Sequence, residues 1–301
     1  MPSDPVLVTG ATGRQGGAAV RALVAADVPV RALVRDPARA RAVEALGAEL
    51  VVGDFDDRDS LVRAADGARA LFSVQMPRFT GETFDYEGEV RQAVNLMEAA
   101  AAVGVPQFIQ TSASGVGQHT EHPEWAEDRW PGIGPAMGAK QAIEERLRAS
   151  GFPFWTLLKP SFFMENFTPS MAFLFPRGVE GGLVSLLKPT TMMSLVAAHD
   201  VGVAVAAVVA APERFDRVEL ELASDYRSMT EVAAVLSDAL GAPLTAPDMT
   251  TEEALAAGMP VMGAGHDFLN AGQPARPGFA RELGIPLTRF EDWAREHLRA
   301  A

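Results

Sequence analysis

Three glycines at three-residue spacing, Gly10, Gly13 and Gly16, follow a short apolar run at residues 6–8. Residues 18–26 then have the composition of a helix. A strand, a glycine-rich turn and a helix in this order bind the pyrophosphate of a dinucleotide. The turn brings the backbone close to the phosphates, and the first N–H groups of the helix point at the anion. We therefore predict a nucleotide site here, which also includes three side chains inside the turn: Thr12, Arg14 and Gln15.

Arg35 directly follows the second predicted strand, residues 29–34, where the adenosine ribose of a bound dinucleotide lies in this kind of fold. A planar guanidinium binds a phosphate with two parallel hydrogen bonds. We therefore predict NADP(H) rather than NAD(H) as the cofactor. Two alternatives stay open: Asp36 accepts a hydrogen bond from an unphosphorylated ribose, or the segment is only a solvated helix start.

The ends of the next two predicted strands add three candidate cofactor contacts. Asp54 and Phe55 follow residues 49–52, where we expect the carboxylate to accept from the adenine amine and the ring to pack on the base. Asp54 could equally cap the helix that follows. Gln75 follows residues 70–74 and is expected along the ribose side of the cofactor.

Strands and helices that alternate through the first half of the chain position these residues. Besides the segments above, the pattern predicts strands at 107–111 and 154–158 and helices at 38–46, 60–65, 85–103 and 139–149. Such alternation indicates a doubly wound parallel sheet with helices on both faces, the Rossmann type of α/β fold.

The pattern changes after residue 159. Later elements are predicted as helices at 199–211, 229–240, 252–257 and 290–299 and a strand at 217–223. We expect an NAD(P)-binding domain over residues 1–159, with its sheet completed by later segments. A smaller C-terminal α/β lobe over residues 160–301 is expected to bind the substrate.

The composition is that of a globular protein, with 48% hydrophobic and 22% charged residues. The net charge of −13 argues against direct binding of nucleic acid, which needs clustered cations. The chain has no cysteine, which excludes disulfides, thiolate metal sites and cysteine nucleophiles. No secretory signal and no long apolar segment is visible, so we expect a cytoplasmic protein without a membrane partner.

Four stretches resemble the NmrA-like family of atypical short-chain dehydrogenase/reductases. They are Val-Thr-Gly-Ala-Thr-Gly-Arg-Gln-Gly-Gly at 8–17, Val-Arg-Asp-Pro at 34–37, Gly-Asp-Phe-Asp-Asp at 53–57 and Leu-Lys-Pro-Ser-Phe-Phe-Met-Glu-Asn-Phe at 158–167. Arg-Phe-Glu-Asp-Trp at 289–293 is also similar to the C-terminal signature of the family. The resemblance implies a Rossmann core, a small substrate lobe and a preference for NADP(H). It covers quinone and triphenylmethane-dye reductases as well as non-catalytic redox sensors.

The resemblance also implies a tyrosine four residues before a lysine, which protonates the product in the wider superfamily. Here Ala136 stands four residues before Lys140, and the only tyrosines, Tyr86 and Tyr226, do not have this spacing. The resemblance gives Lys140 a catalytic role at the nicotinamide ribose. The residue pattern alone also fits an exposed lysine that pairs with Glu144 one turn later.

The ends of the fifth and sixth predicted strands supply the remaining predicted contacts near the nicotinamide. The resemblance puts an active-site serine at Ser112, with Ser114 as the second choice, although hydroxyls at a strand end also satisfy backbone groups. Pro160 and Phe163 are expected to wall the nicotinamide. Phe162 is expected to touch the substrate, and for both Phe162 and Phe163 packing between the lobes is the open alternative.

Residues 118–135 form a predicted loop before Lys140 that carries two histidines and two tryptophans. We expect His119, His122, Trp125 and Trp130 to lie over the substrate side, where the rings grip a flat substrate and one histidine supplies a proton. No metal is expected, because a loop rich in Pro and Gly is a poor platform for the His-x-x-His pair.

These observations predict an NADPH-dependent reductase of a small conjugated or aromatic acceptor, such as a quinone, an enone or a dye. Such acceptors take up a hydride without an obligatory enzyme acid, so the missing tyrosine is compatible with turnover. The alternative is a non-catalytic NADP(H)-sensing regulator that acts through a protein partner, which the missing tyrosine also fits. A homodimer is compatible with both.

Overall fold

The computed structural model describes residues 4–81, 83–126, 130 and 133–298. The chain forms two compact units, neither of which is continuous in sequence. The first comprises Met1–Val116, Ala136–Lys159 and Ala198–Leu220, and the second comprises Gly117–Pro135, Pro160–Ala197 and Glu221–Ala301. The segment 198–220 therefore returns to the first unit after the chain has entered the second.

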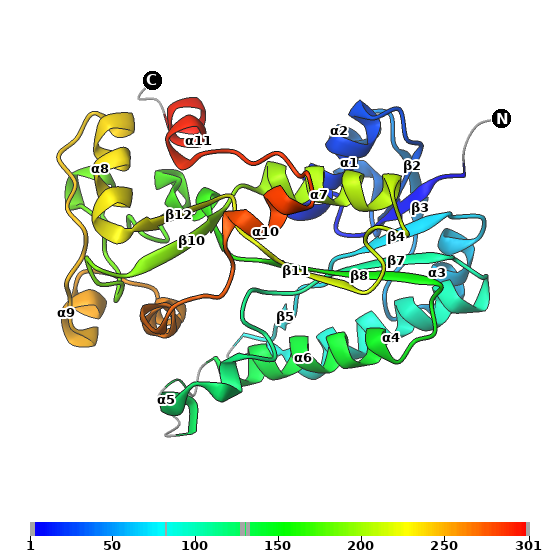
Figure 1. Ribbon diagram of the computed structural model, residues 1–301, viewed down its shortest axis with the longest axis horizontal. Coiled ribbons are helices and arrows are strands. Elements are labelled where there is room, and N and C mark those ends of the chain that lie inside the picture. The colour runs from blue at the N-terminus through cyan, green and yellow to red at the C-terminus, as the bar shows by residue number, and fades with distance from the viewer. Residues whose placement is uncertain (1–3, 82, 127–129, 131–132, 299–301) are drawn as a thin grey trace. The chain divides into compact units, whose positions relative to one another are not determined.

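The first unit is built on a seven-stranded sheet in the order β11-β8-β7-β4-β1-β2-β3 (Figure 1). Its strands are β1 (Val6–Val8), β2 (Val30–Val34), β3 (Glu49–Val52), β4 (Ala70–Ser73), β7 (Gln107–Thr111), β8 (Phe154–Pro160) and β11 (Val218–Leu222). Five of the strand pairs are parallel: β1 with β2, β1 with β4, β2 with β3, β4 with β7, and β7 with β8. This confirms the predicted Rossmann-type fold.

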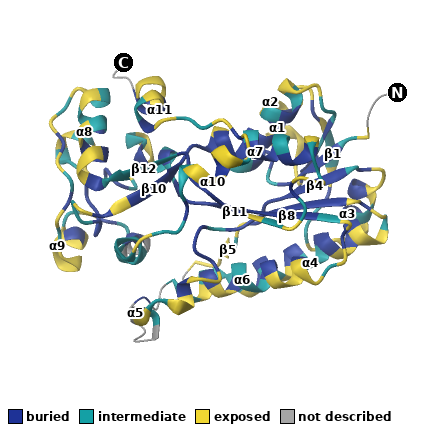
Figure 2. Ribbon diagram, in the orientation of Figure 1, coloured by how far each residue is buried: buried dark blue, intermediate teal, exposed yellow. Residues whose placement is uncertain are grey.

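Helices cover both faces of this sheet, which explains why residues 6–8 in β1 and 70–72 in β4 are continuous apolar runs. Helices α1 (Arg14–Ala25) and α7 (Ala198–Ala210) lie on one face, and α3 (Arg58–Ala65), α4 (Tyr86–Ala102) and α6 (Gly134–Arg148) lie on the other (Figure 1). Leu61, Leu96 and Ile143 from the second group pack with Leu71 and Phe108 of the strands. In Figure 2 the central strands β1, β4 and β7 are buried, while the edge strand β3 is not and the helices are buried on one side only.

Helices α1 and α7 pack closely because of a glycine. A Cβ added at Gly202 of α7 would lie 2.3 Å from the carbonyl oxygen of Ala18 in α1, which is closer than any real contact. Only glycine therefore permits this separation between the helices.

Several element boundaries differ from the predictions. Helix α1 begins at Arg14 rather than at residue 18, and α6 begins at Gly134 rather than at 139. The predicted helix 38–46 is broken into a 3-10 turn η1 (Pro37–Arg39) and a short α2 (Arg41–Glu44). A small hairpin, β5 (Arg78–Phe79) with β6 (Phe84–Asp85), was not predicted; the rings of its two phenylalanines lie 5.2 Å apart.

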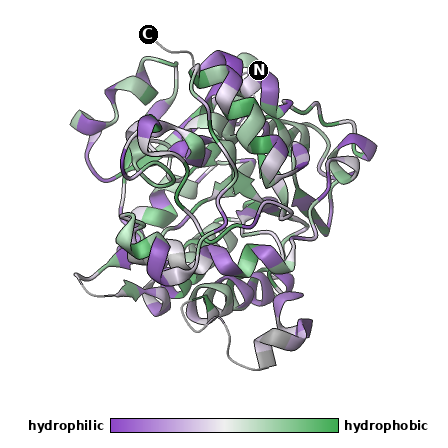
Figure 3. Cartoon of the chain, turned by 90° about the vertical axis from the view of Figure 1, so that its left-hand side faces the viewer, coloured by the Kyte–Doolittle hydropathy of each residue, from purple (hydrophilic) through white to green (hydrophobic). Residues whose placement is uncertain are grey.

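The second unit contains a three-stranded sheet in the order β12-β10-β9. Its strands are β9 (Phe162–Phe163), β10 (Met192–Val196) and β12 (Asp225–Ser228). Its helices are α5 (Pro123–Ala126), α8 (Met229–Leu240), α9 (Thr251–Ala256), α10 (Pro277–Glu282) and α11 (Phe290–His297), with 3-10 segments η2 (His119–Glu121), η3 (Met164–Phe167), η4 (Pro169–Met171), η5 (Val179–Gly181) and η6 (Val261–Ala271). Hydrophobic and hydrophilic residues are mixed along single helices (Figure 3), as amphipathic helices require.

The predicted strand at 217–223 corresponds to β11, which completes the large sheet, whereas β10 and β12 were not predicted.

Among the described residues, no helix combines the length and the apolar character that crossing a membrane requires.

Replacing Gly202 with Ala is expected to lower the free energy of unfolding by about 1–3 kcal/mol, because the added methyl group forces α1 and α7 apart. The control is Gly138→Ala in α6, where an added Cβ meets nothing within 4 Å. It should be neutral or stabilise by up to about 1 kcal/mol, since Ala has the higher helix propensity. Urea unfolding followed by circular dichroism measures both, and equal stabilities of the two variants would contradict the packing argument.

Candidate functional site

The glycine turn joins the end of β1 to the start of α1 with almost no free space. Gly10 has a φ of +61°, in the left-handed region that favours glycine. A Cβ on Gly16 would lie 2.3 Å from the carbonyl oxygen of Gly10, so α1 can start this close to the strand only with glycine there. Thr9 Oγ1 accepts from the backbone N–H of Val74 at 2.7 Å and so fixes the turn beside the end of β4.

The N-terminus of α1 fits an anion. Its N-cap residue, Gly13, offers no side-chain cap, and the first turn contains no acidic residue. The first N–H groups of a helix have no partner within the helix and carry the positive end of its dipole. Gln15 lies in this turn, and its Oε1 accepts from the Thr111 hydroxyl at 2.7 Å, which connects the turn to the end of β7.

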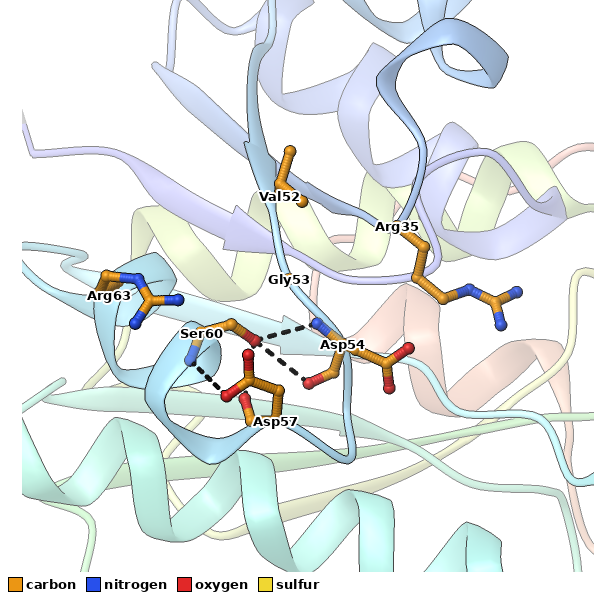
Figure 4. Close-up of a pocket in the computed structure, with 7 residues that line it drawn as sticks. All are labelled: Arg35, Val52, Gly53, Asp54, Asp57, Ser60 and Arg63. Atoms are coloured by element: carbon orange, nitrogen blue, oxygen red, sulfur yellow. Dashed lines mark hydrogen bonds between the residues drawn. The ribbon is translucent and has the colours of Figure 1, made fainter.

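A small open pocket of about 200 Å³ lies at the carboxyl ends of β2 and β3. Arg35, Asp54 and Arg63 line it together with Val52, Gly53, Asp57 and Ser60. Figure 4 shows the Arg35 and Asp54 side chains on one side of the strand end and Arg63, from α3, on the other. A cationic group at the end of β2 is therefore available to a phosphate.

Two aspartates near this pocket are helix caps. Asp36 accepts from the backbone N–H of Ala38 at 2.9 Å and caps η1, which weakens its candidacy as the ribose acceptor. The cap of α3 is Asp57, which accepts from the N–H of Ser60, so Asp54 does not have the capping role. Asp54 accepts from the N–H of Asp56 at 2.9 Å.

Phe55 packs, partly buried, against the core on the side of α3 and α4, and its carbonyl accepts from the Asn95 amide at 2.9 Å. Gln75 is buried at the end of β4, donates to the Ser73 hydroxyl at 2.6 Å and accepts from Gln110 at 3.0 Å. The adenine role of Phe55 and the ribose role of Gln75 stay predictions.

Lys140 pairs across two helices. Its Nζ donates to Oε1 of Glu89 in α4 at 3.0 Å, not to Glu144 of its own helix. Tyr86 lies one turn before Glu89; burial raises the pKa of its phenol, and the negative charge of Glu89 raises it further. The Glu89 carboxylate is a partner of Lys140 that the helical i+4 rule did not identify.

Glu144 is the centre of a buried polar network. It accepts from the Ser112 hydroxyl at 2.6 Å, from Arg148 at 2.8 Å and from Lys159 at 3.3 Å. Arg148 also donates from Nε and from one terminal nitrogen to the two carboxylate oxygens of Glu219. This hydrogen bonding is the main cause of the lowered pKa of Glu219. The single hydroxyl proton of Ser112 is therefore directed at Glu144, and Ser112 offers other groups its lone pairs only.

The substrate-side residues of the second unit are mostly packed into its interior. Phe162 belongs to the hydrophobic core of the unit, with its ring 5.5 Å from that of Phe167. Pro160 is buried at the end of β8, and Phe163 is half-buried in β9. Ser114 is buried at 4% exposure in the first unit.

The aromatic residues of the loop at 118–135 pack within the second unit. Residues 127–129 and 131–132 lie outside the described part of the chain. The rings of Trp125 and Trp130 both meet Phe268 of η6 edge-on, at 6.4 and 5.3 Å. His119 lies 4.5 Å from Trp125 and His122 lies 5.4 Å from Trp130. The proposed lid role of these side chains stays a prediction.

His266, also in η6, is a buried titratable group that sequence reasoning missed. It contacts Phe162 and Phe173 edge-on, at 5.8 and 4.8 Å, and its Nδ1 lies 3.1 Å from the Ser185 hydroxyl. Burial lowers the pKa of His266 to about 4, so the ring is neutral at pH 7. A single histidine in a stretch of Gly and Met gave no signal in the sequence.

A sequence profile of the NmrA-like family matches residues 2–267. The chain belongs to the NmrA-like family. An NAD(P)H azoreductase of Xenophilus azovorans is 29% identical over 98% of each chain. A (4-alkanoyl-5-oxo-2,5-dihydrofuran-3-yl)methyl phosphate reductase of Streptomyces griseus is 32% identical, again over 98% of each chain.

Among solved structures, the triphenylmethane reductase of Citrobacter sp. complexed with NADP(H) is similar to this NmrA-like protein, with a TM-score of 0.78. The match covers 97% of this chain and 100% of that one at 22% identity, and at that identity it supports the fold alone. The glycine turn and the Arg35 pocket nevertheless fit a dinucleotide on their own chemistry, since one offers N–H donors without an acidic neighbour and the other a guanidinium.

Replacing Glu144 with Ala is expected to lower the free energy of unfolding by about 3–5 kcal/mol, because Lys159 and Ser112 lose a buried acceptor. Glu145→Ala is the control, since the side chain of this exposed neighbour accepts from Gln141 of the same helix and its removal should change stability by less than about 0.5 kcal/mol. Chemical unfolding of both variants is the measurement, and a loss below about 1 kcal/mol for Glu144→Ala would mean that the network contributes little.

Stability is also expected to fall as the pH is lowered from about 6.5 towards 4, because the unfolded state binds a proton at His266 while the folded state keeps the ring neutral. The loss reaches about 3 kcal/mol at most. Thermal unfolding across this pH range should show a flatter profile for His266→Gln than for the exposed control His199→Gln. Parallel profiles for the two variants would contradict the assignment.

Proposed function

We propose that this NmrA-like protein is an NAD(P)H-dependent oxidoreductase that reduces a small aromatic or conjugated acceptor, with NADPH as the preferred reductant. The observation that carries the proposal is the full-length similarity to two reductases, at 29% and 32% identity. The glycine turn and the pocket at the end of β2 support it independently.

Three parts of the first unit hold the cofactor in this proposal. The N–H groups at the start of α1 bind the pyrophosphate, Arg35 binds the 2′-phosphate, and Lys140 binds the nicotinamide ribose. NADPH, when bound, supplies the hydride. The ammonium of Lys140 adds positive potential nearby, which stabilises an enolate or phenolate that forms on the acceptor.

The absence of the tyrosine favours acceptors that need no enzyme acid. Ala136 occupies the position four residues before Lys140, and Ser112 already donates its proton to Glu144. A quinone, an azo compound or a cationic dye yields a stabilised product that water protonates. The proposal therefore excludes simple ketones as preferred substrates, since an alkoxide needs a positioned proton donor.

NADPH consumption in the presence of quinones, azo compounds, enones and cationic dyes tests the proposal. Saturable turnover above a protein-free blank is expected with at least one of these classes. Lys140→Ala should reduce kcat/KM by about tenfold or more, because an interaction with a charged group contributes about 1.5–3 kcal/mol. Binding of NADPH without turnover of any acceptor would favour the alternative of a dinucleotide sensor that acts through a protein partner.

The cofactor preference is tested at Arg35. Arg35→Ala is expected to lower the ratio of NADPH to NADH affinity by about tenfold, because the guanidinium no longer meets the 2′-phosphate. Arg39→Ala, four residues later in η1 and outside the pocket, is the matched control. Fluorescence titration of both nucleotides gives the ratio, and an equal change in the two variants would contradict the role of Arg35.

A further inference from the structure

Lys140 and Glu89 lie at the carboxyl edge of the large sheet. Helices α4 and α6 follow β4 and β7 and run back along the sheet, so their first turns are at the edge where open α/β sheets bind ligands (Figure 1). Ser112 is the first residue after β7, and its hydroxyl contacts Glu144 of α6. Glu144 therefore lies level with the carboxyl end of β7. Lys140 lies one turn nearer the start of α6 than Glu144, and therefore beyond the strand end.

The two members of this ion pair differ in exposure. The Glu89 side chain is 2% exposed, while that of Lys140 is 24% exposed. Oε1 of Glu89 accepts from Lys140 at 3.0 Å, and among the described residues no donor reaches the buried Oε2. A buried carboxylate with one unsatisfied oxygen is less stable than a neutral side chain of the same shape. The buried ion pair is therefore only weak evidence that Glu89 serves folding stability.

We propose that Glu89 is a positioning residue that holds the Lys140 ammonium in place for the nicotinamide ribose. An ammonium has three hydrogen-bond donors, and Glu89 takes one and leaves two for ribose hydroxyls. Without Glu89, the long lysine side chain would lose rotamer freedom when the ligand binds. The ion pair with Glu89 already restricts the Lys140 side chain, so less conformational entropy is lost on binding. This inference rests on the proposed function, because it assigns Lys140 to the ribose.

Two variants test separately the charge of Glu89 and the length of its side chain. Glu89→Gln keeps the shape and removes the charge, and Glu89→Asp keeps the charge and shortens the side chain by one methylene. Glu98→Gln is the matched control, since Glu98 is an exposed residue of α4 that pairs with Arg58 at 3.1 Å. Calorimetric titration with NADPH and with adenosine 2′,5′-bisphosphate, which lacks the nicotinamide ribose, gives the affinities. Urea unfolding without ligand gives the stability.

Both Glu89 variants should bind NADPH about tenfold more weakly than the wild type and bind the bisphosphate unchanged. Glu89→Gln should be at least as stable as Glu98→Gln. Equal weakening of both ligands, or unchanged affinity for NADPH, would overturn the inference. A loss of stability in Glu89→Gln without a loss of NADPH affinity would make the pair structural. If the wild type binds neither ligand, the proposed function fails, and the inference fails with it.

Discussion

The geometry of the first unit depends on how closely α1 packs. At its start, the absence of a side chain on Gly16 lets the helix begin against the Gly10 carbonyl. Along its length, the absence of a side chain on Gly202 lets α7 lie against Ala18. These two contacts fix the direction of α1 relative to β1, so the N–H groups of its first turn stay at the end of the strand. A dinucleotide site made of backbone groups is only as well ordered as the helix that carries them.

Two buried carboxylates, Glu144 in α6 and Glu89 in α4, illustrate different uses of a charge in the interior. Glu144 is fully enclosed and receives a hydroxyl, a guanidinium and an ammonium from three further chain positions, so its desolvation is compensated. Glu89 receives one ammonium through one oxygen. The first arrangement joins α6 to β7 and β8. In the second, one carboxylate oxygen has no donor among the described residues, which is uncommon for a buried polar group in a folded protein.

The sequence predicted what local spacing encodes. Gly10, Gly13 and Gly16 predicted the turn, and Arg35, predicted to lie at the end of a strand, lines a pocket there together with Asp54 and Asp57. It did not predict the partner of Lys140, because the i+4 rule considers one helix while Glu89 lies on another. It also missed His266, whose burial depends on rings from β9 and from residue 173. Contacts between distant segments follow from packing, which no single periodicity records.

In the proposed function, the direction of the Ser112 hydrogen bond matters as much as the missing tyrosine, because both concern which group could protonate a product. A site that lacks one proton donor could use a neighbouring hydroxyl, but Ser112 has a single proton and gives it to Glu144 at 2.6 Å in the interior. Turning that hydroxyl towards a substrate would leave a buried carboxylate oxygen without this donor, at a cost of about 1–3 kcal/mol or more. In the proposed function, Lys140 at this edge stabilises negative charge on the acceptor without having to transfer a proton. This arrangement suits acceptors whose reduced form is a stable anion or a neutral molecule.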